Sequence, residues 1–130
     1  MSIRYAITIE GNTLFVTASG FDESLAEVEQ YGLAIINAAI AGGVTRILCN
    51  ETDLEYRLDT LDTYRAAEFI AEHAPRVAKV ALVCAPQHMA DARFWEDVAV
   101  NRGLLVCAFK DLPSATQWLN PPPSGPDLGD

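Results

Sequence analysis

The chain has 130 residues, with 18 acidic against 9 basic side chains and a formal net charge of −9. This length is enough for one compact domain and too little for two ordinary ones, and half of the residues are hydrophobic, which supplies a core of useful size. An acidic surface repels nucleic-acid phosphates and anionic lipid, so neither is an expected partner. No apolar run is long enough for a membrane span, and residues 1–5 lack a signal-peptide block, which favours a cytoplasmic protein.

The first third of the chain has the pattern of a β-hairpin followed by a long helix. Apolar and polar residues alternate near 5–9 and 14–18, with turn residues at 10–13 between them. Asp22 is expected to be the N-cap of the helix, which shows apolar residues at three-and-four spacing from Leu25 onward. Gly42 and Gly43 end it.

Strands and helices alternate through the rest of the chain. Apolar runs predict strands near 46–49, 78–83 and 104–108, the last two buried on both faces. Helices are expected from Asp59 and Thr60 to Pro75, over 90–102 with Phe94, Val98 and Ala99 facing inward, and over 111–119.

The resulting order, β-β-α-β-α-β-α-β-α, predicts an α/β fold with a mostly parallel sheet and the hairpin strand as an antiparallel edge. Residues 1–119 are expected to form a single domain. The tail, residues 120–130, contains four prolines and two glycines, and we expect it to be disordered.

The hairpin, the first helix ending in Gly42-Gly43, and a closing helix that finishes in Trp118-Leu119 carry a family resemblance. In this order of elements the chain resembles the SpoIIAA-like, or STAS-like, small bacterial proteins. The resemblance implies a regulatory domain that binds a protein partner. It also implies a phosphate-accepting hydroxyl at the start of the second helix, where Thr60 stands, because anti-sigma-factor antagonists of this wider family are switched there.

Local physics favours a different role for Thr60. Asp59 and Asp62 already place negative charge at this helix start and would repel a phosphate. The spacing of Asp59 with Asp62, or of Thr60 with Thr63, is that of a helix cap. We therefore predict that this segment is a structural cap and that Thr60 is unmodified.

The acidic stretch 50–57 has two interpretations. Oxygen ligands at Glu51, Asp53 and Glu55 would suit a hard cation, but the segment lacks the glycine and the closing glutamate of an EF-hand loop. The favoured interpretation is a solvated loop before the second helix. No metal site is predicted.

The three cysteines, Cys49, Cys84 and Cys107, form no C-x-x-C pair and fall on predicted strands, so core packing is favoured over reactivity. His88 lies in the loop after the fourth strand, with Arg93 and Trp95 on the following helix. Trp95 is expected to lie off the inward face, where an exposed tryptophan beside Arg and His can anchor a partner or a ligand.

These features favour a function in binding rather than in catalysis. The first hypothesis is a partner-binding regulatory domain, and the second is a carrier of an apolar small molecule or lipid. The third is an enzyme using Cys84 or His88. No cofactor is predicted, and a patch including Trp95 is expected to support a homodimer.

Overall fold

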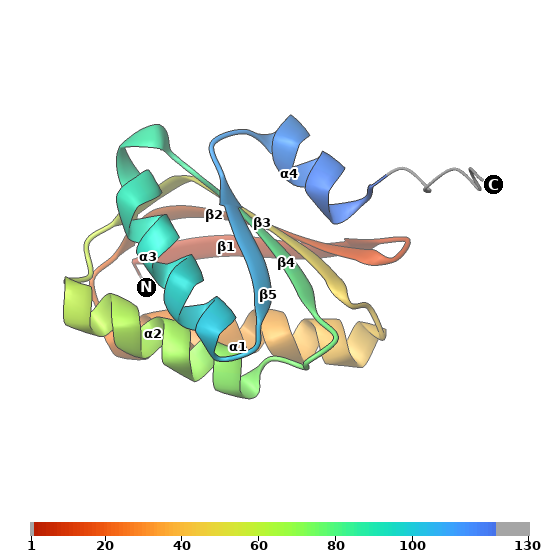
Figure 1. Ribbon diagram of the computed structural model, residues 1–130, viewed down its shortest axis with the longest axis horizontal. Helices are drawn as coiled ribbons and strands as arrows, with labels where there is room; N and C mark the ends of the chain where they lie inside the picture. The colour runs from red at the N-terminus through yellow and green to blue at the C-terminus, as the bar shows by residue number, and fades with distance from the viewer. Residues whose placement is uncertain (1, 122–130) are drawn as a thin grey trace.

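In the computed structural model, which describes residues 2–121, five strands form one sheet in the order β1-β2-β3-β4-β5 (Figure 1). β1 and β2 are antiparallel, and the other neighbouring strands are parallel. The α/β architecture and the antiparallel edge strand predicted from the sequence are therefore confirmed. The elements in chain order are β1 (Ile3–Glu10), β2 (Thr13–Asp22), α1 (Leu25–Gly42), β3 (Arg46–Tyr56), α2 (Thr60–His73), β4 (Lys79–Cys84), a short 3-10 helix (Pro86–His88), α3 (Met89–Asn101), β5 (Leu105–Phe109) and α4 (Leu112–Leu119).

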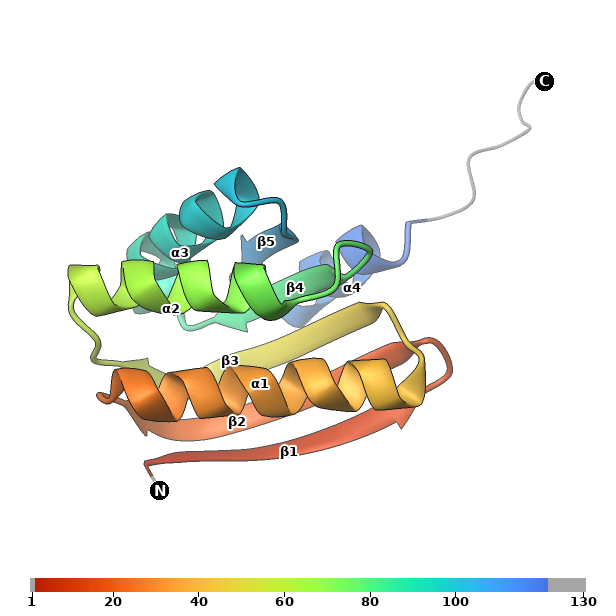
Figure 2. The same cartoon turned by 90° about the horizontal axis from the view of Figure 1, so that it is seen from below.

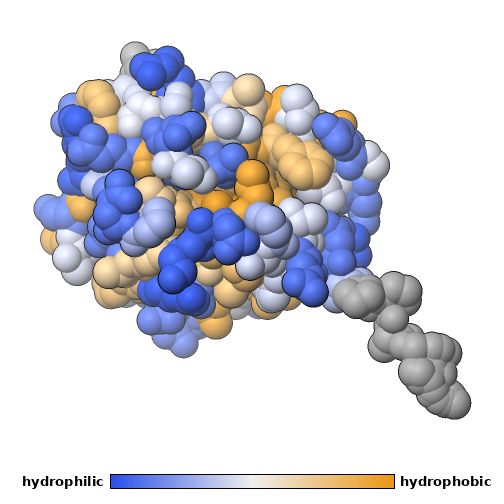
Figure 3. Space-filling model, turned by 90° about the horizontal axis from the view of Figure 1, so that it is seen from above, coloured by the Kyte–Doolittle hydropathy of each residue, from blue (hydrophilic) through white to orange (hydrophobic). Residues whose placement is uncertain are grey.

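Helices cover the two faces of the sheet unequally. The helices α1, α2 and α3 lie on one face, whereas α4 alone packs on the other, against β3, β4 and β5 (Figure 1). Each parallel connection moves one strand further in the same direction, and right-handed crossovers then place all three connecting helices on the same side. Figure 3 looks onto the α4 side, where apolar surface shows among hydrophilic side chains.

The helix α2 is the outermost part of the three-helix layer. It packs mainly against its two neighbours, α1 and α3 (Figure 2). Its fully buried residues are both alanines, Ala66 and Ala67, so it brings little side-chain volume toward the sheet. Space is therefore left between α2 and the strands beneath it.

The predicted start of α1 is wrong by two residues. Ser24 is the N-cap, and its side chain accepts a hydrogen bond from the Glu27 N–H. Asp22 instead ends β2, where its Oδ1 atom accepts hydrogen bonds from the N–H groups of Arg57 and Leu58 at 2.6 and 3.1 Å. The carboxylate thus holds the segment that leads from β3 into α2.

The acidic stretch 50–57 is not a solvated loop, because β3 continues through it to Tyr56. β2 is long enough to pair with β3 over this whole length, with a register shift between Thr17 and Ser19. Glu51 consequently becomes a buried strand residue that is only 8% exposed.

Two burial predictions are also wrong. Phe94, expected to face inward, is 37% exposed, whereas Trp95 packs against the core. Leu105 is exposed and Cys107 is only half-buried, although both were expected in a strand covered on each side. Leu105 and Cys107 alternate with the buried residues Val106 and Ala108, and they lie on the face of the sheet that α4 alone covers.

None of the helices between residues 2 and 121 has the length and apolar character that crossing a bilayer requires. The predicted tail lies outside the described residues except for Asn120 and Pro121. Asn120 accepts a hydrogen bond from the Arg46 guanidinium at 2.7 Å.

Candidate functional site

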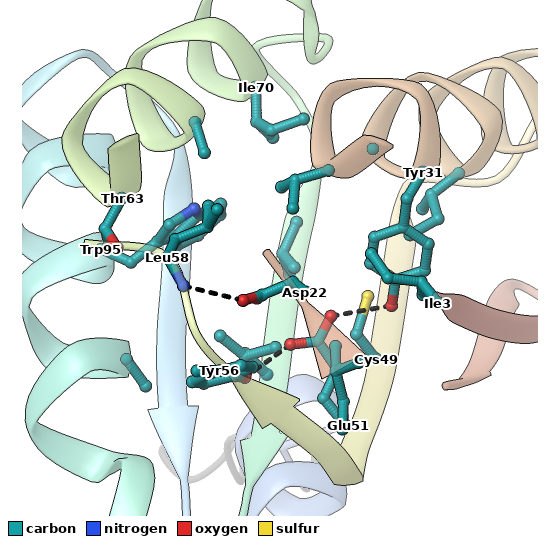
Figure 4. A pocket seen from close by; sticks show the side chains of 18 of the residues that line it. Ile3, Asp22, Tyr31, Cys49, Glu51, Tyr56, Leu58, Thr63, Ile70 and Trp95 are labelled. Atoms are coloured by element: carbon teal, nitrogen blue, oxygen red, sulfur yellow. Dashed lines mark hydrogen bonds between the residues drawn. The ribbon is translucent and has the colours of Figure 1, made fainter. Parts of the chain in front are cut away.

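The three residues predicted around the β4–α3 loop have different environments. His88 is half-buried against Tyr56, with ring centroids 5.0 Å apart. Arg93 is exposed and pairs with Glu96 at 3.6 Å. Trp95 instead points into the space between α2 and the sheet (Figure 4). The structure therefore does not join these residues in one surface patch, and the predicted dimer surface loses its exposed tryptophan.

At the start of α2, Asp59 is the N-cap. Its carboxylate accepts a hydrogen bond from the Asp62 N–H at 2.8 Å, and its carbonyl oxygen accepts one from the Thr63 hydroxyl. Thr60 is the first residue of the helix and is exposed. Its hydroxyl makes no hydrogen bond to any residue between 2 and 121. The capping role falls to Asp59, and the function of Thr60 stays a prediction.

The cysteine thiols are held in unreactive surroundings. Burial raises the pKa of Cys84 to about 11, and its Sγ atom contacts the Met89 thioether at 3.2 Å. Burial also raises the pKa of Cys49 well above its usual value. Because only a thiolate is nucleophilic, neither thiol is suited to covalent chemistry near neutral pH.

A pocket of about 130 Å³ lies between the sheet and the helices α1, α2 and α3. Most of its lining is aliphatic or aromatic, including Ile35 from α1, Leu82 from β4 and Trp95 from α3. α2 contributes the small residue Ala66, together with Thr63 and Ile70. The small side chain of Ala66 leaves part of the space beneath α2 unfilled.

Carboxyl groups mark one end of this apolar pocket. The Tyr31 hydroxyl donates to Glu51 Oε2 at 2.7 Å, and the Tyr56 hydroxyl donates to Glu51 Oε1 at 2.5 Å. Figure 4 shows that Glu51 reaches in from β3, Tyr31 from α1, and Asp22 from the end of β2. Asp91 of α3 also lines the pocket.

Burial governs the acid–base behaviour of this group. Desolvation raises the pKa of Glu51, and the two tyrosine hydroxyls partly oppose this because they stabilise the carboxylate. Burial likewise raises the pKa of Asp22, against the two backbone N–H donors. The pKa values of Tyr31 and Tyr56 are raised well above 10.0 by burial and by the neighbouring Glu51 charge, so both remain hydrogen-bond donors.

Sequence reasoning missed Glu51, Tyr31 and Asp22 as parts of one site. A signal was present for Glu51, because it stands two residues after Cys49 and thus on the same side of a continued strand. Tyr31 also falls four residues before Ile35 on the inward stripe of α1. Nothing local predicts that Asp22 folds back onto residues 57 and 58.

No family model and no curated protein matches the sequence. Solved structures match in fold. An anti-sigma factor antagonist from Mycobacterium paratuberculosis aligns with a TM-score of 0.63 at 12% identity, over 91% of this chain and 94% of that chain. An uncharacterised protein with a SpoIIAA-like fold from Shewanella loihica gives a TM-score of 0.53 at 20% identity, over 91% and 94% of the two chains.

SpoIIAA itself, an anti-sigma factor antagonist in its unphosphorylated form, aligns with a TM-score of 0.50 at 15% identity, over 88% of this chain and 95% of that chain. The chain therefore has the SpoIIAA-like, or STAS-like, fold that the order of its elements predicted. At these identities the likeness is one of fold.

Proposed function

We propose that this protein is a binding protein that holds a small apolar molecule in the pocket beneath α2. The pocket itself carries the proposal, because an apolar cavity between a sheet and its covering helices is where small-molecule sites commonly form. A cavity of about 150 Å³ with aliphatic and aromatic walls takes up benzene. The space here, about 130 Å³, suits an apolar group of that size.

Binding is favoured over catalysis by the chemistry of the available side chains. Cys84 faces a thioether, and burial raises its pKa to about 11. The Nε2 atom of His88 is 3.5 Å from the Tyr56 N–H, from which it accepts. These two residues, the candidates for an enzyme, are thus engaged by uncharged groups of the protein.

Native mass spectrometry of the protein purified from its source cell tests the proposal. We expect an added mass that is lost on denaturation, and uptake of toluene by the ligand-free protein in an NMR titration. A bare mass together with no toluene uptake would overturn the carrier function.

A second candidate function is a regulatory domain that binds a protein partner. It is supported by the fold shared with two anti-sigma factor antagonists. It is also supported by the start of α2, where Thr60 is exposed and the next residue, Leu61, is a 56% exposed apolar side chain. Exposed apolar residues next to a polar rim are typical of interaction surfaces.

Thr60→Ala and Leu61→Ala separate the two functions. If α2 docks a partner, Leu61→Ala weakens its capture from the source cell, whereas ligand uptake by the pocket is unchanged. If Thr60 is a switch, phosphothreonine is found at position 60 in protein from that cell. Partner capture that is indifferent to both substitutions, with no phosphate on Thr60, counts against this surface.

A further inference from the structure

The acidic end of the pocket contains more negative charge than the surrounding protein balances. Glu51 and Asp22 are each only 8% exposed, and they are close enough for the charge of Asp22 to raise the pKa of Glu51. Among residues 2–121, no lysine or arginine forms an ion pair with either of them. Burying unpaired carboxylates is costly, and an opposite charge offsets that cost.

The two cationic candidates near Asp22 lie outside the pocket lining. The Arg57 guanidinium lies on the surface, where it stacks over Phe21 at 3.9 Å and pairs with Glu55 at 3.1 Å. The His88 ring lies against Tyr56, and its Nε2 atom is 3.5 Å from the Tyr56 backbone nitrogen. Neither residue is among those that line the pocket.

Asp22 lines the pocket and, among residues 2–121, has one carboxylate oxygen without a hydrogen-bond donor. Both of its backbone donors, from Arg57 and Leu58, bond to Oδ1. Within the part of the chain described, Oδ2 has no hydrogen-bond donor. A buried acceptor without a donor is unfavourable, and the carboxyl group lies beside Leu58 at the pocket wall (Figure 4).

We propose that the ligand is a small apolar amine, whose ammonium group lies between Glu51 and Asp22 and whose hydrocarbon part fills the space below α2. This inference rests on the proposed carrier function and names its ligand class. An ammonium group supplies three donors and a positive charge, which match the free acceptor of Asp22 and the unbalanced carboxylates. A carboxylate ligand would be repelled, and an alcohol would leave the charge in place.

Other cations fit the site less well. Over residues 2–121, no group of three or more His, Cys, Asp or Glu side chains is placed to hold a metal ion. The walls beyond the carboxyl groups are apolar, with Ile35, Leu82 and Trp95 among them, and would leave a hydrated metal ion without partners. The small volume also restricts the ligand, because sites for drug-sized molecules measure roughly 300–1,000 Å³.

A matched set of ring compounds tests the ligand class on the full-length protein. Benzylamine, benzyl alcohol and phenylacetate share a phenyl ring and one methylene group but end in an ammonium, a hydroxyl and a carboxylate. In NMR titrations at pH 7, we expect benzylamine to bind about 10-fold more tightly than benzyl alcohol, as hydrogen bonds to charged groups imply. Phenylacetate is expected to bind most weakly.

The variant Glu51→Gln keeps the size of the side chain and removes its charge. It should weaken benzylamine binding about 10-fold and change benzyl alcohol binding little. Glu55→Gln is the matched control, because Glu55 lies on the same strand but is exposed and pairs with Arg57. It should leave the affinities of all three compounds unchanged.

The possible outcomes separate this inference from the carrier function. If toluene and benzyl alcohol bind but benzylamine binds no more tightly, the amine proposal is wrong and the carrier remains. If phenylacetate binds best, the amine proposal is also wrong. If no ring compound binds, the carrier function fails as well. The ranking on the wild-type protein decides the question even if Glu51→Gln does not fold.

Discussion

Glu51 is a carboxyl group held out of water between two tyrosine hydroxyls, and its ionisation is linked to folding. Burial raises its pKa above the usual value of 4.5. Between that value and the raised pKa, the folded chain keeps a proton that the unfolded chain has lost. The free energy of unfolding contributed by Glu51 therefore falls as the pH rises through this window.

Glu51→Gln removes this ionisation, so the wild-type protein should lose stability relative to the variant as the pH rises from about 4.5 toward neutral. Urea unfolding of both proteins between pH 4 and 8 measures the difference. Asp22 is present in both proteins, and its charge coupling to Glu51 changes the difference in the same direction. Glu55→Gln gives the opposite trend, because the Arg57 hydrogen bond lowers the pKa of Glu55 and its contribution is lost as the pH falls. A constant difference between wild type and Glu51→Gln would contradict the burial of a titrating Glu51.

The cap of α2 gives a second prediction at single residues. Asp59→Ala should lower the free energy of unfolding by about 1 kcal/mol, because it removes the acceptor for the Asp62 N–H. Thr60→Ala should change it by less than about 0.5 kcal/mol, as exposed substitutions usually do. Chemical denaturation of the two variants distinguishes them. Equal losses would mean that Thr60 shares the cap.

Where elements meet, two glycines with positive φ differ in what surrounds them. Gly43 ends α1 at φ 67° with open space around it. Gly20, at φ 93° in β2, lies against the backbone of Ser2, and a Cβ there would overlap the Ser2 carbonyl oxygen. That same oxygen accepts a hydrogen bond from the Phe21 N–H at 3.1 Å.

Alanine at each glycine measures this difference. Gly43→Ala should cost about 1 kcal/mol, the penalty for a side chain in the left-handed region. Gly20→Ala should cost about 3 kcal/mol or more, because the backbone of β1 must also move. Thermal or urea unfolding compares the two variants. Similar losses in the free energy of unfolding would show that the start of β1 can move at little energetic cost to make room for a side chain at position 20.

The strands and helices could be predicted from the sequence because the spacing of apolar residues along each element is characteristic of a strand or of a helix. The failures occur where position in the sheet decides burial. β3 extends to Tyr56 because β2 pairs with it over this length. The residues of β3 alone do not indicate that such a partner strand exists. On α3, both Phe94 and Trp95 are aromatic, and the small residues Ala92 and Ala99, which are buried, decide that Trp95 faces the sheet. The pocket was missed for the same reason, since its walls come from several elements far apart in the chain.

At the scale of the whole molecule, the pocket is a region of incomplete packing, and incomplete packing lowers the stability of the fold. A void forfeits contacts between the atoms that line it. Ala66 and Ala67 are adjacent on α2 and equally buried. Ala66 lines the pocket, whereas Ala67 packs in the cluster with Leu104 and Val106. A larger side chain at position 66 would therefore enter the pocket, whereas the same side chain at position 67 would enter a region that is already filled.

Ala66→Leu should raise the free energy of unfolding by about 1 kcal/mol, as cavity-filling substitutions do, and lower the affinity for toluene or benzylamine at least about 10-fold by occupying their space. Ala67→Leu should instead lower the free energy of unfolding by about 1–3 kcal/mol, because it overpacks a filled interface, and leave the affinity nearly unchanged. Urea unfolding and NMR titration on both variants check the two signs. The carrier function requires stability and binding to move in opposite directions at Ala66, since the space that weakens the fold is the space that takes up the ligand. A destabilised Ala66→Leu protein that still binds toluene with wild-type affinity would place the ligand elsewhere.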